Sequence, residues 1–482
     1  MEPRRLRRRA LLRPIEPMGM PMSSSLESSS GPRTITIGQV GARLDRLPTG
    51  PFHRRVLLVA VVTFVFEIGD QSATGLVAAS LREHLGTDLT GIAFAVSAMY
   101  LGLLVGSLVA GQVGDRFGRR STLSWGMAAM AVFSALAAFS PNITTLVVLR
   151  FLTGIGLGAT YIGIVVYLSE MFPARRRGLS LAVGVAIGTV GSVLLTVLAR
   201  AVVPMGEHGW RIVYAVGLLG LLAVPACRRL PESPRWLIAR GRAVEAAAVL
   251  ENIEKETAAK TGALPEPEVS DTAASAKEAR RLPTSALFRG RLLRSTVMLM
   301  IVWICYSAVQ QVTTTWTPTI LVLRGFTQAE ALSLTSLIVL GSLAGSIAAI
   351  FIADRLPRRA GLVAFTLIAA VAALCFGFVT NLALLIVSGF AIYFFSGGAS
   401  PLINAYMAEE FPTDLRARGS SFAFSTGRLT NVLAPFTIAA VLASLGYHAI
   451  ALGTFAAWAL IAVAALVLGR RRSRTADMVE QV

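Results

Sequence analysis

Apolar stretches of about 18 to 25 residues recur along the whole chain, separated by short polar loops. A helix rises 1.5 Å per residue, so about 20 apolar residues cross a hydrocarbon core of roughly 30 Å. The pattern predicts an all-α polytopic membrane protein with twelve transmembrane helices. The predicted ranges are 56–81, 91–113, 121–139, 144–168, 178–200, 210–227, 292–316, 331–352, 360–380, 382–407, 418–444 and 448–468.

Composition and charge placement support a membrane protein and exclude a nucleic-acid-binding one. The chain has 482 residues, of which 54% are hydrophobic and 15% charged, and its mean hydropathy is +0.65, which is too apolar for a soluble protein. The formal charge of +18 comes mostly from Lys and Arg in alternate loops, as in the cytoplasmic loops of membrane proteins. We therefore expect a multi-pass cell-membrane protein with both termini in the cytoplasm and no nucleic-acid partner. The opposite side keeps only Arg82, Arg200, Arg211 and Arg324.

The polar segments divide the chain into five predicted parts. The basic N-terminus has no apolar segment directly after it and leads into a Ser-rich tract, so it is not a cleavable signal. The central polar segment is too short for an enzyme domain and predicts a cytoplasmic linker with one or two surface helices. The predicted parts are a largely disordered basic tail at 1–55, a six-helix half at 56–227, the linker at 228–291, a second six-helix half at 292–468 and a cytoplasmic tail at 469–482.

The sequence offers no metal, disulfide or catalytic constellation. Cys227, Cys305 and Cys375 lie in apolar segments at unrelated positions, which indicates neither a disulfide framework nor a metal site. No nucleophile or phosphate-binding loop accompanies them. We expect a protein that is not an enzyme and that uses no cofactor other than a proton gradient.

An internal repeat relates the two halves. GQVGDRFGRR at 111–120 has a counterpart in IFIADRLPRR at 350–359, which places Asp115 and Asp354 239 positions apart. YLSEMFP at 167–173 matches YMAEEFP at 406–412 with the same offset, and a basic cluster with Gly follows each copy. One offset shared by two separate motifs predicts two parallel repeats of six helices, as in transporters.

These motifs, together with RFLTGIGLGATY at 150–161, resemble the major facilitator superfamily over nearly the whole chain from residue 43. The second loop copy departs from the family pattern, with Ile350 and Pro357 where the first copy has Gly. The resemblance implies a transporter that works by alternating access, with a small-molecule substrate, protons and the lipid bilayer as its partners. We expect it to be a monomer.

Further motifs resemble one group within this superfamily, the metabolite and aromatic-acid:H+ symporters and niacin-transporter-like proteins related to organic-ion carriers. FEIGD at 66–70 resembles that group's FDxxD pattern, with Glu67 in place of the first Asp. WTPTIL at 316–321 and STGRLTNVLAPF at 425–436 are similar to the group's helices 7 and 11. PESPRWL at 231–237 is shared with sugar porters.

Three alternatives to an organic-anion symporter remain open. A sugar or polyol:H+ symporter fits PESPRWL and the acid in the first helix, but the paired tyrosine of sugar porters is absent from helix 7. A drug/H+ antiporter is less favoured, because GVAIGTVGS at 184–192 lacks the Gly-Pro element of many exporters. A substrate-sensing receptor with this fold is the third.

Four charged residues fall at depth within predicted helices, where an ionised group costs roughly 2.5 to 3.5 kcal/mol. From the helix rise, Glu67 lies about 16 Å and Asp70 about 21 Å from the cytoplasmic boundary. Arg150, about 9 Å below the outer boundary, is level with Asp70, and Arg428, at about 15 Å, is level with Glu67. The depths predict an ion pair between Asp70 and Arg150, which is also consistent with a purely structural role for both.

The depths and residue types suggest separate roles for these groups. Glu67, Asp70 and Arg150 are the predicted proton-coupling residues, with Glu67 as the group that takes up and releases the proton. The Arg428 guanidinium suits a bidentate contact with a substrate carboxylate. The predicted substrate-binding residues are Arg428, Gln310, Gln311, Tyr306 and Tyr393, of which Tyr393 is equally explained by packing.

The charged loop motifs predict a cytoplasmic gate that holds the two halves together when the cavity faces outward. The predicted gate residues are Asp115, Arg116, Arg119, Arg120, Glu170, Asp354, Arg355, Glu409, Glu410, Arg416 and Arg418. Taken together, the motifs predict proton-coupled symport of a small aromatic or heterocyclic carboxylate, such as nicotinate or benzoate.

Overall fold

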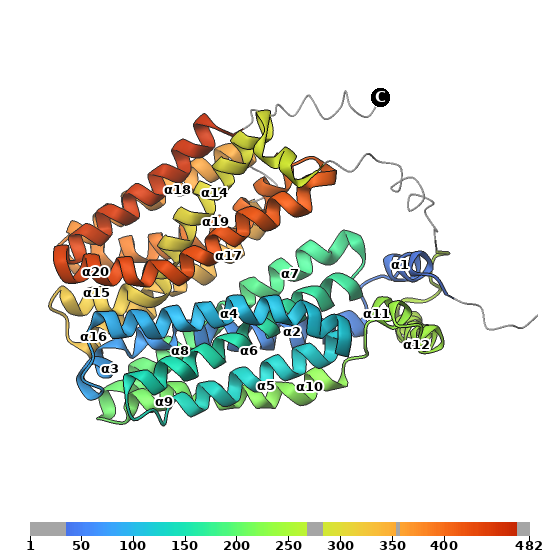
Figure 1. Ribbon diagram of the computed structural model, residues 1–482, viewed down its shortest axis with the longest axis horizontal. Coiled ribbons are helices and arrows are strands. Elements are labelled where there is room, and N and C mark those ends of the chain that lie inside the picture. Colours follow the sequence, from blue (N-terminus) through green and yellow to red (C-terminus); the bar gives the residue numbers. More distant parts are fainter. Residues whose placement is uncertain (1–34, 268–282, 353–356, 470–482) are drawn as a thin grey trace, which may run out of the picture. The chain divides into compact units, whose positions relative to one another are not determined.

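The computed structural model describes residues 35–267, 283–352, 357–469, and within them the secondary structure is entirely helical (Figure 1). The first six-helix half comprises α2 (Pro51–Leu76), α3 (Ala78–His84), α4 (Leu89–Phe117), α5 (Arg119–Ala137), α6 (Ile143–Met171), α7 (Ala174–Gly188), α8 (Val190–Val202), η1 (Val203–Met205), α9 (Gly209–Ala215), η2 (Val216–Leu222) and α10 (Ala223–Arg229). The second comprises η3 (Thr284–Phe288), α14 (Gly290–Gln311), η4 (Val312–Trp316), α15 (Thr317–Leu323), α16 (Gln328–Ile338), α17 (Leu340–Ile352), α18 (Arg358–Phe378), α19 (Leu382–Glu410) and α20 (Thr413–Val467).

The predicted all-α membrane fold is confirmed. Ten helices in the described residues are long and apolar enough to cross a bilayer. One of them, α20, turns at Gly446, whose φ of 75° favours glycine, so it contains two helical arms. Helix α5, with 19 residues, is long enough to cross but more polar at its start. With α5 and both arms of α20, the helices cover all twelve predicted ranges.

Equivalent helices in the two halves repeat the offset found in the sequence. Helices α6 and α19 are both 29 residues long, and their first residues, Ile143 and Leu382, are 239 positions apart. Each begins after an asparagine whose side chain accepts a backbone N–H, which caps the helix start. The repeated sequence therefore specifies the same local structure twice.

Close helix contacts hold the first half together. Helix α6 packs against α4 and α5, and α2 packs against α7 and α8. Gly154 on α6 permits this, because a Cβ there would lie 2.0 Å from the Met99 carbonyl oxygen of α4. Small residues that let helix backbones approach are the usual means of packing in lipid. In the second half, α17 packs on α19 and α20 packs on α14 and α18.

Helix α14 continues through a π-helical turn, η4. In η4 the regular i to i−4 bonds are interrupted, and the Tyr393 hydroxyl of α19 donates to the Thr313 carbonyl oxygen. Thr317 donates to the same oxygen and to that of Val312. Side chains thus satisfy carbonyl groups that the π-turn releases, as membrane helices require.

Several contacts join the halves near the ends of the helices predicted to face outward. The Ser97 hydroxyl on α4 donates to the Val432 carbonyl on α20, and Gln328 donates to the Ser80 hydroxyl at 2.7 Å. Gly75 on α2 lies against the η4 backbone, since a Cβ there would be 2.2 Å from the Thr315 carbonyl oxygen. The two halves therefore touch backbone to backbone at this level.

Three further helices lie beside the loop end of the first half: α1 (Ile37–Asp45), α11 (Pro234–Ala239) and α12 (Ala243–Thr261). Helix α1 falls in the range predicted to be a largely disordered tail, and it is fixed by a capping box at Thr36. Residues 1–34 and 470–482 lie outside the described residues. Helices α11 and α12 fall within the predicted linker.

An ion-pair network ties α1 to α12. Arg43 donates two hydrogen bonds to the Glu254 carboxylate, at 2.9 and 2.6 Å, and Arg46 donates a third at 2.6 Å. Burial alone would raise the pKa of Glu254, but the hydrogen bonds from Arg43 and Arg46 outweigh it, and the pKa lies below its ordinary value. The sequence before the first membrane helix is thereby attached to the segment between the halves.

Candidate functional site

The opposed charges of the first half meet inside its helix bundle. Asp70 on α2 and Arg150 on α6 are 7% and 0% exposed, and the Arg150 Nη1 lies 2.8 Å from Asp70 Oδ2. Arg150 Nη2 also donates to the Asp70 carbonyl oxygen at 3.0 Å, and the Ser134 hydroxyl of α5 donates to Asp70 Oδ1. The ion pair predicted from depth is present, and it links three helices.

Asp70 also borders a cavity of about 290 Å³ between α2, α5, α8 and the residues of α9 and η2. Its walls are mostly apolar and include Phe66, Leu195 and Val213. Arg150 does not line this cavity, so Asp70 is the member of the ion pair that borders it.

Glu67 lies one turn of α2 before Asp70 and is 3% exposed. Its Oε1 accepts a hydrogen bond of 2.6 Å from the Gln71 amide. Glu67 interacts electrostatically with Arg428 of the second half, as the shared depth estimate predicts. The two carboxyl groups of α2 therefore face different cations, one in each half of the protein.

Arg428, on the first arm of α20, reaches across to the first half. Its Nη1 donates to the Ser107 hydroxyl on α4, and its guanidinium carbon lies 5.6 Å from the Tyr161 ring centroid on α6. The Phe424 ring, one turn earlier on α20, lies at 5.1 Å. Among the described residues, a neutral hydroxyl is the only hydrogen-bond partner of this cation between two aromatic faces. Such a cation can still accept an anionic ligand.

Ser107, Tyr161 and Phe424 were not among the residues singled out from the sequence. Tyr161 had a usable signal, because it lies 11 residues after Arg150, which is close to three full turns and places both on one face of α6. Ser107 and Phe424 had none, since a lone Ser or Phe in an apolar helix is ordinary.

The predicted substrate-binding residues of helix 7 are of two kinds: two glutamines with polar partners, and a tyrosine packed against aromatic rings. Gln310 accepts a hydrogen bond from the Ser396 hydroxyl, and Gln311 donates to the Asn431 carbonyl oxygen of α20 at 3.2 Å. Tyr306 is 5% exposed, lies between Trp303 and Trp458 and donates to the Ser396 carbonyl oxygen.

Tyr393 is likewise 6% exposed, and its hydroxyl is used by the π-turn described above. Both tyrosines thus have partners inside the second half, which favours packing for them. Gln310 and Gln311 lie on the element that contacts the first half at η4.

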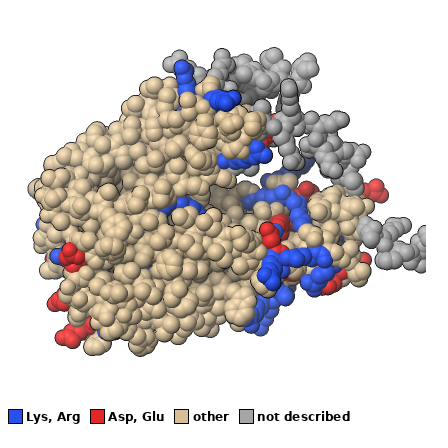
Figure 2. Space-filling view, in the orientation of Figure 1, with Lys and Arg blue, Asp and Glu red and all other residues tan. Residues whose placement is uncertain are grey.

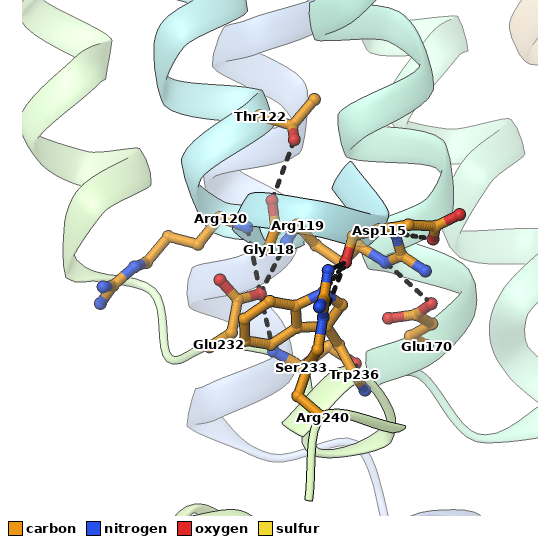
Figure 3. Close-up of polar contacts among 10 residues, drawn as sticks. All are labelled: Asp115, Gly118, Arg119, Arg120, Thr122, Glu170, Glu232, Ser233, Trp236 and Arg240. Carbon is orange, nitrogen blue, oxygen red and sulfur yellow. Dashed lines mark hydrogen bonds and ion pairs between the residues drawn. The ribbon is translucent and has the colours of Figure 1, made fainter. Parts of the chain in front are cut away.

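The charged loop motif of the first half forms a network that includes the linker (Figure 3). Arg119 lies 2.7 Å from Asp115 and 3.2 Å from Glu170 on α6. The Asp115 carbonyl oxygen accepts hydrogen bonds from the Trp236 indole at 2.8 Å and from Arg240.

Glu232 completes the network from the linker side. Its Oε1 accepts from the backbone N–H groups of Arg119, Arg120 and Ser233, at 2.8, 3.2 and 3.0 Å. This carboxylate caps the start of α5, where the helix dipole favours negative charge. PESPRWL and GQVGDRFGRR, which are separate motifs in the sequence, are therefore one structural unit within the first half.

The second copy of the gate is only partly described. Asp354 and Arg355 lie outside the described residues. Glu410 accepts a hydrogen bond of 2.6 Å from the Ser295 hydroxyl, while Arg116 and Arg416 are exposed. The remaining predicted gate residues, Glu409 and Arg418, lie at the end of α19 and in the first turns of α20.

Comparison with known proteins identifies transporters as relatives. A family model described as "Sugar (and other) transporter" matches residues 62–469. The chain is 30% identical to the gallate transporter of Pseudomonas putida, covering 89% of this chain and 94% of that protein. It is 28% identical to the niacin transporter NiaP of Acinetobacter baylyi, covering 89% and 95%.

A solved structure shares the fold. The inward-open xylose transporter XylE from E. coli superposes with a TM-score of 0.71, covering 88% of this chain and 98% of that one, at 18% identity. At this identity the likeness concerns the fold alone.

Proposed function

The chain belongs to the sugar (and other) transporter family, and we propose that it is a proton-coupled symporter that carries a small organic anion across the cell membrane. Family membership makes it a secondary transporter of the major facilitator superfamily rather than an enzyme, related to transporters of niacin and gallate. The proposed substrates are aromatic or heterocyclic carboxylates such as nicotinate or benzoate. The proposed orientation places both termini in the cytoplasm.

The observation that carries the proposal is the setting of Arg428. Its guanidinium lies between the Tyr161 and Phe424 rings and is hydrogen-bonded to Ser107. A carboxylate can replace the hydroxyl and form two parallel hydrogen bonds with the guanidinium, while the rings offer apolar walls to a flat substrate. A neutral sugar needs hydrogen-bonding amides and hydroxyls rather than a cation between rings.

Glu67 supplies the proposed coupling. While Glu67 is ionised, its charge competes with a substrate carboxylate for Arg428. A proton on Glu67 removes this competition, so the proton and the anion bind together and the loaded site has no added net charge. A neutral load lowers the cost of moving the site through a low-dielectric membrane interior. Asp70 and Arg150 would stay paired and hold α2 and α6 in register.

The cytoplasmic motifs fit a gate in the same cycle. Arg119 is held by Asp115 and Glu170, and Trp236 and Arg240 bind the Asp115 carbonyl. We propose that this unit moves as a rigid part of the first half, and that its exposed members meet the second half when the cavity faces outward.

Uptake into proteoliposomes tests the proposal. Purified protein is reconstituted, and entry of radiolabelled nicotinate, benzoate and xylose is followed with and without an acid exterior. We expect concentrative uptake of a carboxylate only with the gradient, and none of xylose. Equal uptake with and without the gradient would contradict proton coupling, and uptake of xylose alone would contradict an anionic substrate.

A further inference from the structure

Trp125 marks one outer face of the first half at a membrane boundary. It is 65% exposed, and two further large apolar side chains on the same helix, Val132 and Leu136, are 38% and 44% exposed. The opposite side of α5 packs against α6 and α10. The exposed side therefore faces acyl chains, and Trp125, less than two turns from the start of α5, lies where chains meet headgroups.

One exposed arginine contacts this tryptophan, and two more exposed arginines lie on the same two helices. The Arg228 guanidinium carbon, in the last turn of α10, lies 5.6 Å from the Trp125 ring centroid. Arg229 follows it, and both are exposed. Arg120 is also exposed, and its side chain extends away from the Asp115 network, beside the segment that leads to Glu232 (Figure 3). Arg120 was grouped with the gate from the sequence, but its side chain leaves the gate network.

The loop after α10 connects the helix end that carries Arg228 and Arg229 to the start of α5, which carries Arg120. Glu232 accepts hydrogen bonds from the backbone N–H groups of Arg119 and Arg120, which fixes this loop against the start of α5. Arg229 precedes Glu232 by three positions and Arg228 by four. Lys and Arg gather at the end of the first half where α11 and α12 lie (Figure 2).

The positive charge of this patch is not neutralised by carboxylates. Within the residues that the structure describes, no Asp or Glu lies at ion-pair distance from Arg120, Arg228 or Arg229. Glu232, the carboxylate of the adjoining loop, directs its Oε1 at three backbone N–H groups. These three arginines can therefore donate hydrogen bonds to an external anion, because no carboxylate of the described residues pairs with them.

We propose that Arg120, Trp125, Arg228 and Arg229 bind the headgroup phosphate of an anionic phospholipid in the cytoplasmic leaflet. Planar guanidinium groups suit phosphate oxygens, and the indole suits the glycerol level of the lipid. The apolar stripe beyond Trp125 continues along the acyl chains. A zwitterionic lipid carries an outer cation that three arginines repel, so the site discriminates by headgroup charge. Each arginine near an anionic surface contributes a factor of about five in affinity.

Quenching of Trp125 by labelled lipid tests the site on the full chain. The purified protein in detergent micelles is titrated with phosphatidylglycerol or phosphatidylcholine bearing a spin label near the headgroup. The Trp125→Phe variant identifies the fluorescence that comes from Trp125. We expect phosphatidylglycerol to quench this fluorescence at concentrations at least tenfold below phosphatidylcholine, and Arg228→Gln/Arg229→Gln to weaken its binding about 25-fold.

The matched control is Arg175→Gln/Arg176→Gln, which removes two adjacent exposed arginines from the first turn of α7. It should leave quenching by phosphatidylglycerol unchanged. Equal quenching by the two lipids, or equal loss in the control, would overturn the proposal. Displacement of the lipid by inorganic phosphate at similar concentrations would assign the patch to a free anion and overturn the lipid site. Unchanged emission from the other tryptophans verifies that each variant is folded.

Discussion

The Arg150 guanidinium on α6 donates to the Asp70 carboxylate on α2 at 2.8 Å, and the pair is almost completely buried. The residues are 80 positions apart in the sequence and come from different helices. A third helix contributes the Ser134 hydroxyl to the same carboxylate. A buried charge pair of this kind is costly to break from one side, because the remaining charge has no partner.

Replacing Asp70 alone should therefore destabilise the protein strongly. In Asp70→Asn, Arg150 keeps its charge in an interior without a counter-charge, and we expect a loss of about 3 to 5 kcal/mol in unfolding free energy. Thermal unfolding in detergent measures this as a lowered midpoint. The double variant Asp70→Asn/Arg150→Met, which removes both charges, should recover part of the loss. Single and double variants as stable as the parent would show that the pair does not hold the helices.

Glu67→Gln separates coupling from substrate exchange. The amide keeps the size of the side chain and its contact with Gln71 but cannot take up a proton. Concentrative uptake driven by a pH gradient should be lost, while exchange of external for internal substrate in proteoliposomes should continue. Glu83→Gln, an exposed carboxyl group near the outer end, is the control and should retain both activities. Gradient-driven accumulation by Glu67→Gln would rule out Glu67 as the coupling group.

Arg428→Lys tests recognition of a carboxylate. Lysine keeps the charge but loses the planar pair of donors, so we expect substrate to bind roughly 10- to 100-fold more weakly, measured by thermal shift with benzoate or nicotinate. Ser107→Ala removes the hydroxyl that accepts a hydrogen bond from the Arg428 guanidinium in the free protein. That variant should bind substrate at least as well as the parent, and equal weakening in both would point to a general loss of structure.

Gly75→Ala should shift the conformational equilibrium from the inward-facing toward the outward-facing state. A Cβ at this position would lie 2.2 Å from the Thr315 carbonyl oxygen in the other half, so the outer contact cannot form without backbone movement. The measurement uses a background in which Cys375 is replaced and Ser97→Cys is introduced. A membrane-impermeant thiol reagent added outside should react with this cysteine several times faster in Gly75→Ala than in the protein with Gly75. Gly154→Ala introduces a similar clash inside the first half and should not increase the reaction rate. An unchanged rate in Gly75→Ala would mean that this contact does not close the outer side.

Docking of α1 on α12 should depend on pH through Glu254. The pKa of Glu254 is lowered in the folded protein. Its ion pairs therefore stabilise the docking of α1 fully above about pH 4.3, the pKa of the unfolded chain, and this stabilisation is lost as the pH falls through the lower pKa of the folded protein. Distance measurements between spin labels at Gly38 and Lys260, both exposed, should show α1 released in acid, and released at pH 7 in Glu254→Gln. Glu245→Gln, on the same helix, removes a carboxylate that pairs with Arg242 and should leave α1 docked. A docked α1 in Glu254→Gln would contradict this role.

The levels of the charged residues along the helix axes were largely predictable from the sequence. Helix positions convert directly into depth, so the level of Asp70 with Arg150 and of Glu67 with Arg428 followed from counting residues. The repeat offset likewise predicted that α6 and α19 would be equivalent, because similar sequences form similar helices. Tyr306 and Tyr393 show the limit of this approach: their depth is suitable for a substrate site, but each is turned toward partners within the second half.

By itself, the sequence determined which segments lie in the bilayer, which ends face the basic side, that the halves are repeats and at what depth the charges lie. These depend on hydrophobicity and helix rise, which are local along the chain. Only the tertiary structure decided that Ser107 and Tyr161 meet Arg428, that PESPRWL binds the start of α5, and that the Arg120 side chain points away from the Asp115 contacts. These depend on the rotation and lateral packing of each helix, which are set by the contacts of all the side chains together.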